Sequence, residues 1–112
     1  MMETKHTTGP WVIDWNVSRL DIFGSDETTL VASLRRSSLS QAIDEAARSN
    51  ARLIAAAPEL YDALRELLTD MVIAQGNMRK AAKRDPAWEG CAEIIQPRVD
   101  AARAAIAKAE GK

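Results

Sequence analysis

A chain of 112 residues is long enough for one small domain, and its composition excludes several classes of protein. Fifteen basic residues nearly balance sixteen acidic ones, so no overall charge favours nucleic acid or an anionic membrane as partner. The single cysteine excludes an internal disulfide and is typical of a reducing cytoplasm, and no run approaches the roughly 20 apolar residues of a membrane span. Because a small, alanine-rich domain buries little surface by itself, we expect a cytoplasmic homo-oligomer with one domain over residues 1–112.

Residues 1–37 carry the signals of a β-meander. Three short runs of β-prone residues are separated by turn residues: 11–15, 18–24 and 28–36. The second run alternates apolar Leu20 and Ile22 with Arg19 and Asp21, which is typical of a half-buried strand. Short loops between the runs predict three antiparallel strands in chain order.

Residues 38–112 are helix formers almost without a break. Ser38 followed by Gln41 is the signature of a capping box, which predicts a helix start. One stripe then recurs at spacings of four and three: Leu39, Ile43, Ala46, Asn50, Leu53 and Ala57. Proline disfavours helix in the residue before it and is tolerated in a first turn, so we expect this helix to end near Ala56 and the next to begin at Pro58.

The second and last helices each carry one long apolar seam. The seam of the second helix comprises Leu60, Leu64, Leu67, Met71, Ala74, Met78 and Ala81. After a break at Asp85 and Pro86, the seam of the last helix comprises Trp88, Ala92, Ile95, Val99, Ala102, Ile106 and Ala109. Pro97 lies inside this second seam, so we expect the well-formed helix to begin there with Gln96 as its cap.

The two seams predict an antiparallel helical hairpin. The whole chain therefore reads as an α+β fold, with a small antiparallel sheet over residues 1–37 and a helical part over residues 38–112 that supports oligomer formation.

No constellation of catalytic residues is visible. The one histidine, His6, lies in the N-terminal tail, no group of Cys and His has metal-ligand spacing, and the five glycines form no phosphate loop. Cys91 neighbours the last seam and is interpreted as a small buried hydrophobe. We therefore expect a protein that is not an enzyme and that uses no metal and no cofactor.

Asn50 stands out because it falls on the predicted buried stripe, where its amide must find hydrogen-bond partners. It either fixes the register of the helix, as a buried asparagine does in coiled coils, or faces a pocket and binds a ligand. Arg52, two residues on, points to a different face of the helix, so the two side chains cannot hold one small group from a single helix.

Basic and aromatic residues offer a second candidate site. The run from Arg79 to Arg84 either complements the negative end of a helix or forms a phosphate-binding rim together with Arg35 and Arg36. Trp11 and Trp15 share one face of the first predicted strand. They are either core residues or, beside arginines, a platform on which a nucleobase stacks.

Three segments of the chain resemble a widespread set of small phage and prophage proteins: "KHTTGPW" at residues 5–11, "NARLIAAAPELYDALREL" at 50–67 and "ARAAIAKAEG" at 102–111. Those proteins open with a threonine-glycine-proline-tryptophan motif and continue through short strands to a helix and an alanine-proline-glutamate-leucine restart. The resemblance covers about half of the chain and implies a phage accessory protein.

A more distant similarity of architecture is to the phage sponge proteins that oppose Thoeris defence. That group binds cyclic ADP-ribose-type signals without converting them, and some members bind the cyclic oligonucleotides of CBASS, the cGAS-like defence systems. The similarity implies a counter-defence protein of the host bacterial cytoplasm that sequesters a cyclic nucleotide as a homo-oligomer. No pocket residue of that group is matched individually to this chain. The expected ligand residues are therefore the polar, basic and aromatic candidates described above: Trp11, Arg35, Arg36, Asn50 and Arg52.

Two other functions stay open. An inhibitor that binds a host defence complex, as anti-CRISPR proteins do, would need an exposed acidic or apolar surface, and residues 25–28 and 59–66 offer an acidic one. DNA binding is disfavoured by the near-neutral charge and by the lack of a recognition-helix motif.

Overall fold

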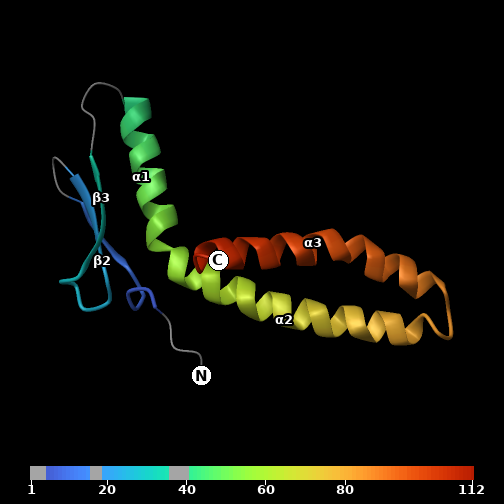
Figure 1. The fold of residues 1–112 in the computed structure, drawn as a ribbon. Coiled ribbons are helices and arrows are strands. Elements are labelled where there is room, and N and C mark those ends of the chain that lie inside the picture. The colour runs from blue at the N-terminus through green and yellow to red at the C-terminus, as the bar shows by residue number, and fades with distance from the viewer. Residues whose placement is uncertain (1–4, 16–18, 36–40) are drawn as a thin grey trace. The chain divides into compact units, whose positions relative to one another are not determined.

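The computed structural model describes residues 5–15, 19–35 and 41–112, with side chains from residue 45 onward in the third segment. Two compact units form, residues 1–60 and residues 61–112. The first unit contains the sheet and the helix that covers it, and the second is a pair of helices (Figure 1). The α+β class is therefore confirmed, while the single domain and the oligomer stay predictions.

The sheet is the predicted meander of three antiparallel strands, β1 (Val12–Trp15), β2 (Arg19–Phe23) and β3 (Leu30–Arg35). Trp15 pairs with Leu20 and Leu20 with Leu34, and a register shift follows between Ile22 and Phe23. The β2–β3 turn is closed by Asp26, whose carboxylate accepts hydrogen bonds from the backbone N–H groups of Thr28 and Thr29 at 3.0 and 2.9 Å.

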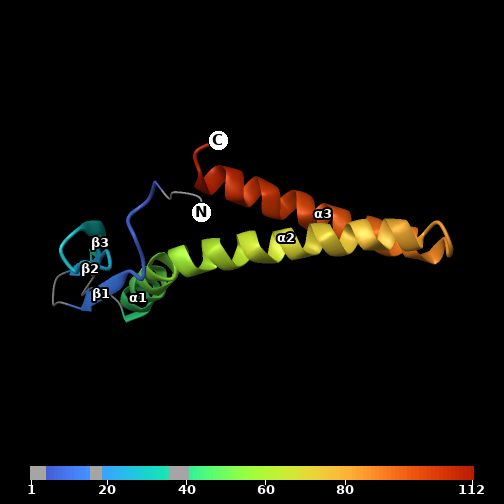
Figure 2. The same cartoon turned by 90° about the horizontal axis from the view of Figure 1, so that it is seen from below.

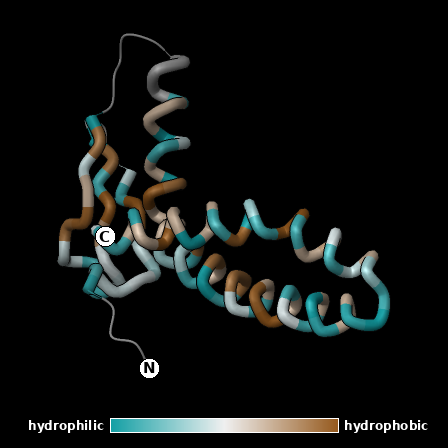
Figure 3. The backbone as a smooth tube through the Cα atoms, turned by 45° about the vertical axis from the view of Figure 1, so that its right-hand side comes forward, coloured by the Kyte–Doolittle hydropathy of each residue, from teal (hydrophilic) through white to brown (hydrophobic). Residues whose placement is uncertain are grey.

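The core of the first unit lies between the sheet and helix α1 (Gln41–Ala55). Leu20 and Ile22 of the central strand are fully buried, and Ala47 and Ala51 of α1 complete the cluster. Hydrophobic residues accordingly alternate along the strands and recur on α1, as the brown segments of Figure 3 show. The burial predicted for Leu20 and Ile22 is confirmed, whereas the predicted alternation is wrong at Asp21, which is buried between them and accepts a hydrogen bond from the Ser33 hydroxyl.

The predicted stripe of α1 is wrong, because Asn50 and Leu53 are exposed and the buried face runs through Ala47, Ala51 and Ile54. The observed stripe is shifted by one residue along the chain from the predicted one. Both stripes contain alanine, which is compatible with packing on a sheet and with exposure to solvent. The face that buries Ile54 instead of Asn50 avoids the cost of desolvating an amide. Ser38 and Leu39 lie outside the described residues, so the capping box is not tested.

The break between the first two helices is confirmed. Helix α1 ends at Ala55 and α2 (Ala57–Ala81) begins two residues later, with Pro58 in its first turn. Pro58 is buried against the N-terminal segment: a Cβ atom added to Gly9 would lie 2.8 Å from the Pro58 Cβ. The same segment is held by hydrogen bonds from Trp11 Nε1 to the Thr7 carbonyl at 3.0 Å and from the Ser25 N–H to the Thr8 carbonyl at 3.1 Å.

The second unit is the predicted antiparallel hairpin, made by α2 from Tyr61 onward and α3 (Ala87–Ala109). Figures 1 and 2 both show α3 returning beside α2. The Tyr61 hydroxyl donates to Glu110 at 2.6 Å at one end, and Gln75 Nε2 donates to the Gln96 side chain at 2.8 Å near the middle. These pairs run in opposite directions along the two helices, as an antiparallel arrangement requires.

Helix α3 passes through Pro97 without ending, so the predicted start at Pro97 with Gln96 as cap is wrong. Proline in a helix removes one backbone donor and crowds the carbonyl four residues earlier. Pro97 is exposed, which leaves that carbonyl near water, and the packing of Ala92 and Val99 on either side holds the helix together. The seam of α3 is otherwise confirmed at its centre, where these two residues are buried.

The seam of α2 is confirmed at five of its seven positions, which include the half-buried Ala74 and Ala81. Leu64, Met71 and Met78 are half-buried, whereas Leu60 and Leu67 are exposed. Leu68, which is half-buried, and Gln75, which is buried, also contribute to the side that contacts α3, although neither belongs to the predicted seam. Two overlapping heptad stripes share Leu64, Met71 and Met78, so the apolar pattern alone does not choose between them. None of the helices in the described part of the chain is long and apolar enough to cross a membrane.

Candidate ligand-binding site

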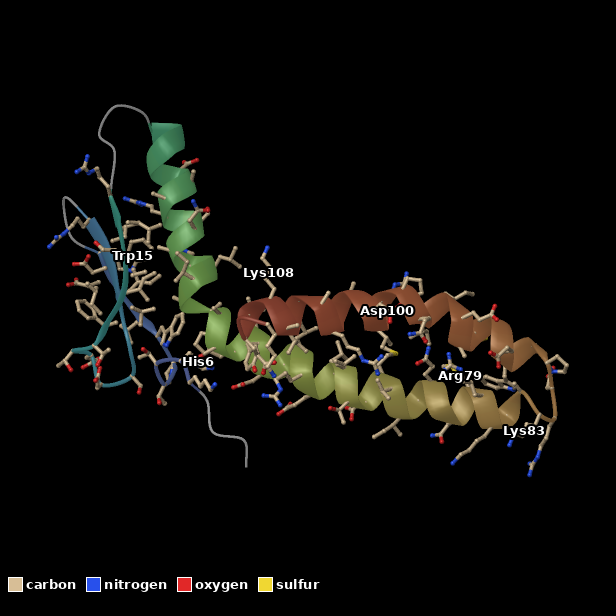
Figure 4. All side chains as sticks on the ribbon, viewed as in Figure 1. His6, Trp15, Arg79, Lys83, Asp100 and Lys108 are labelled. Carbon is tan, nitrogen blue, oxygen red and sulfur yellow. The ribbon has the colours of Figure 1, made fainter. Side chains whose placement is uncertain are left out.

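The exposed aromatic side chain at the end of β1 is the centre of the candidate site. Trp15 is 47 % exposed, and the guanidinium carbon of Arg52, on α1, lies 5.4 Å from the centre of its indole ring. Figure 4 shows Trp15 on the side of the sheet that faces α1. A guanidinium at this distance is attracted by the electron-rich face of the ring, so the strand and the helix together hold one aromatic and one cationic group in contact.

Two further arginines lie at the same end of the sheet. Because Trp15 pairs with Leu20 and Arg19 pairs with Arg35, all three side chains come from the last residue pairs of their strands. Successive residues of a strand point to opposite faces, so Arg19 and Arg35 project from the face away from α1. Arg19 Nε lies 3.9 Å from Asp21 Oδ1, while Asp21 also accepts a hydrogen bond from the Ser33 hydroxyl.

The five predicted ligand residues divide between several places. Arg52 and Arg35 lie at the end of the sheet just described, and Arg36 lies outside the described residues. Asn50 is exposed on α1, so the reading that its amide is buried, as a register lock or inside a pocket, is wrong. Trp11 packs against the core and donates its indole N–H to Thr7, so it has a structural role, and the neighbouring tryptophan is the exposed one.

The signal for Trp15 was present in the sequence. Trp11 and Trp15 share one face of the strand, and the four-residue separation carries Trp15 beyond the buried part of that face. The side chain of Arg52 reaches Trp15 because α1 lies across this face of the sheet (Figure 4). The pairing depends on how helix and sheet pack, which no local pattern in the sequence specifies.

The basic run at residues 79–84 is partly engaged within the hairpin. Arg79 Nη2 donates to the Gln96 side chain at 3.1 Å, and Arg79 Nε lies 4.0 Å from a carboxylate oxygen of Glu89. Figure 4 shows Arg79 between the two helices and Lys83 at the turn. The arginine therefore helps to join α2 to α3, and the exposed Lys80, Lys83 and Arg84 carry the remaining charge.

Two other expectations concern His6 and Cys91. His6 is exposed, with its ring edge-on to Trp11 and Nδ1 at 2.9 Å from the Thr7 carbonyl. Cys91 is exposed on α3, so the expectation of a buried thiol is wrong. Among the described residues, no group of three or more His, Cys, Asp or Glu side chains is placed to hold a metal ion.

Comparison with protein families matches the chain to a family of phage proteins. The model for the Salmonella phage P22 protein Y8K6 matches residues 2–112. The chain belongs to this family. The phage origin expected from the sequence is thereby confirmed, and the match extends over both compact units. Neither the comparison with curated proteins nor that with solved structures gives a match.

Proposed function

We propose that this phage protein is a non-enzymatic binder of a cyclic nucleotide signal, which it sequesters in the cytoplasm of the host bacterium. The observation that carries the proposal is the half-exposed Trp15 in contact with Arg52. Cyclic ADP-ribose-type signals and cyclic oligonucleotides combine flat bases with phosphates. An exposed indole provides a surface on which a base stacks, and a guanidinium provides several N–H donors for phosphate oxygens.

The neighbouring arginines extend the same chemistry. Arg35 and Arg19 add positive charge at the end of the sheet where Trp15 lies, although they project from the opposite face. A ligand stacked on Trp15 would direct its phosphates toward Arg52 first and toward Arg35 around the end of the sheet. Phage origin supports a role against host defence, because a protein that removes an immune signal protects the phage without any catalytic step.

The test is thermal unfolding of the purified protein with a panel of cyclic ADP-ribose isomers and cyclic di- and trinucleotides. A ligand that binds only the folded state, present at 100 times its dissociation constant, stabilises that state by about 2.7 kcal/mol. We expect a large shift with one class of ligand, the loss of this shift in Trp15→Ala and in Arg52→Ala, and recovery of the ligand unchanged after denaturation.

The matched control is Trp88→Ala, because Trp88 lies in the second unit and is exposed to nearly the same extent, 44 %. This variant should keep the full shift. Absence of a shift across the panel, or an equal shift in the Trp15 and Trp88 variants, would contradict the proposed site. A recovered ligand that has been hydrolysed would contradict the non-enzymatic role.

A second candidate function is inhibition of a host defence complex through protein contact. It is favoured by the apolar row formed by Val12, Phe23 and Leu30 across the sheet face that points away from α1. Val12 and Leu30 are both exposed. Under this alternative, Leu30→Asp abolishes inhibition of the host complex, while Trp15→Ala leaves it unchanged.

A further inference from the structure

The two sides of the α2–α3 hairpin differ in chemistry. One side, the polar flank, is closed by side-chain contacts between the helices: Tyr61 with Glu110, Gln75 with Gln96, and Arg79 with Gln96 and Glu89. Gln96 in turn donates to Asp100 at 2.9 Å. All of these contacts lie on one side of the two helices, and among the described residues no comparable set of polar contacts joins the helices on the opposite side.

The opposite side is apolar and incompletely covered, and we name it the apolar flank. The contacts of the polar flank show which way each helix is turned. Because successive helix residues are rotated by about 100°, the same contacts also determine which residues project to the apolar flank. They are Leu67, Met71, Ala74 and Met78 of α2, and Cys91, Ile95, Ala102 and Ile106 of α3. Leu67 is 59 % exposed, Cys91 is exposed, and the large side chains of Met71, Met78, Ile95 and Ile106 are only half-buried.

We propose that the apolar flank is the dimer interface, on which a second copy of this chain packs its own apolar flank to form a four-helix bundle. A two-helix hairpin uses only one contact face per helix, whereas each helix of a four-helix bundle contacts two neighbours. The heptad seam of α2 lies between these two faces, because Leu64, Met71 and Met78 approach α3 while Leu67 and Ala74 point to the open side. The seam therefore fits a helix with two partners.

The arrangement of the two copies follows from residue size and level. The Tyr61–Glu110 and Gln75–Gln96 contacts define which residues of α2 and α3 lie at the same level. A twofold axis parallel to the helices keeps these levels and places α2 against α3 of the partner. Leu67 then lies near the level of the small Ala102 side chain of the partner's flank, which is the large-against-small packing that fills a core.

The charges favour the same arrangement. Residues 62–74 of α2 carry three acidic groups and one basic group, a net charge of −2, and residues 97–109 of α3 carry three basic groups and one acidic group, a net charge of +2. These segments lie at the same level, so the proposed axis places opposite charges together across the interface. Asp70 and Arg98 border the apolar flank and would pair between the two copies.

The size of the flank matches a dimer interface. The hairpin from Tyr61 to Ala81 spans about 30 Å along its axis, and two helices side by side are about 20 Å wide. Such a face offers roughly 600 Å² per partner, or about 1,200 Å² in total, at the lower end of stable interfaces. A second copy, whose flank is identical, supplies the complementary surface that a twofold interface requires.

The test is sedimentation equilibrium of the full chain and of two variants of the apolar flank, Leu67→Asp and Cys91→Glu. Both side chains are exposed in the single hairpin, so the substitutions are compatible with its fold. The wild type should sediment at twice the chain mass of 12.3 kDa. Each variant should weaken the dimer at least about 100-fold, because a charge would be buried at the interface without a partner.

The matched control is Ile73→Asp, since Ile73 is also 59 % exposed on α2 but points away from α3 and from the apolar flank. This variant should remain a dimer, and circular dichroism should show equal helix content in all variants. A monomeric wild type, or flank variants that dimerise as tightly as the control, would overturn the proposal. Asp70→Arg and Arg98→Asp should each weaken the dimer and together restore it; failure of the double variant to recover would overturn the pairing of α2 with α3.

Discussion

Gly9 and Pro58 lie far apart in the sequence but are in contact in the first unit. A side chain at residue 9 would start 2.8 Å from the Pro58 Cβ and 3.0 Å from its Cγ, inside van der Waals distance. Trp11, two residues on, packs on the core and bonds to Thr7. The threonine-glycine-proline-tryptophan segment therefore packs on the start of α2. Its glycine is required by the close approach of Pro58, and its tryptophan by the packing on the core.

Gly9→Ala should lower the free energy of unfolding by about 1–3 kcal/mol, the usual cost of forcing a methyl group into a packed contact. Gly90→Ala is the control, because a Cβ there meets no atom within 4 Å and lies inside a helix. It should raise stability by roughly 0.5–1 kcal/mol. Urea unfolding of both variants distinguishes them, and equal effects would show that Gly9 does not pack on Pro58.

Asp26 makes the β2–β3 turn sensitive to acid. Its pKa is held well below the ordinary value by the Thr29 hydroxyl first and then by the backbone N–H groups of Thr29 and Thr28, which all donate to the carboxylate. A lowered pKa means that the folded state favours the charged form. This contribution is complete above the unfolded-state pKa of about 4 and is lost as the pH falls further.

Asp26→Asn should therefore make the free energy of unfolding less dependent on pH below about 4. The measurement is urea unfolding as a function of pH for the wild type and the variant. Parallel pH profiles for the two proteins would mean that the carboxylate of Asp26 does not support the turn.

Residue patterns predict one member of the central pair of the candidate site, Arg52, and not the other, Trp15. The sequence predicts Arg52 as a polar contact, and its contact with the indole of Trp15 places it at an exposed aromatic surface. Trp11 and Asn50 are predicted for the same site, but Trp11 packs on the core and Asn50 is exposed on another face of α1. A side chain's neighbours on other elements depend on packing, and the local sequence does not contain that information.

At the scale of whole elements, the sequence predicts the order and type of strands and helices well. Strand alternation and the proline at residue 58 are local signals, and the corresponding elements formed where expected. The apolar pattern does not specify the contact face of α2, because Leu67 and Leu68 are both leucine and the polar Gln75 falls outside the predicted seam. Gln75 is nevertheless buried, since it donates to the Ala92 carbonyl at 3.0 Å and to Gln96.

Tyr61 is the only tyrosine of the chain and reports directly on the end of the hairpin. The hydrogen bond to the Glu110 carboxylate raises the pKa of Tyr61 above its ordinary value of 10.0, and the same bond lowers the pKa of Glu110. The tyrosine contributes stability that is present below pH 10 and lost as the pH rises through its folded-state pKa. The glutamate contributes stability that is lost as the pH falls below its ordinary range.

Alkaline titration followed by tyrosinate absorbance should give a pKa above 10 for the wild type. Glu110→Gln should lower this pKa toward the ordinary value because the charged acceptor is removed. Glu89→Gln, which alters a carboxylate of the same hairpin near Arg79, should leave it unchanged. An unaltered titration in Glu110→Gln would contradict the contact between the two helix ends.

In the whole molecule, the two proposed functions belong to different compact units. We propose that the first unit binds a nucleotide through Trp15 and Arg52 and that the second binds another copy of the chain through its apolar flank. The two proposals depend on different residues, so either one can be tested even if the other is wrong. A dimer would carry two ligand sites, which suits a protein that must bind a scarce signal in stoichiometric amounts.

Native mass spectrometry of the purified protein with the cyclic nucleotide panel tests the central claim most directly, because it reports ligand and subunit number together. We expect a species of twice 12.3 kDa that carries intact ligand of one class, with the ligand mass absent from Arg52→Ala and present in Trp88→Ala. A protein that carries no member of the panel at any concentration, or that releases a converted product, would contradict the account.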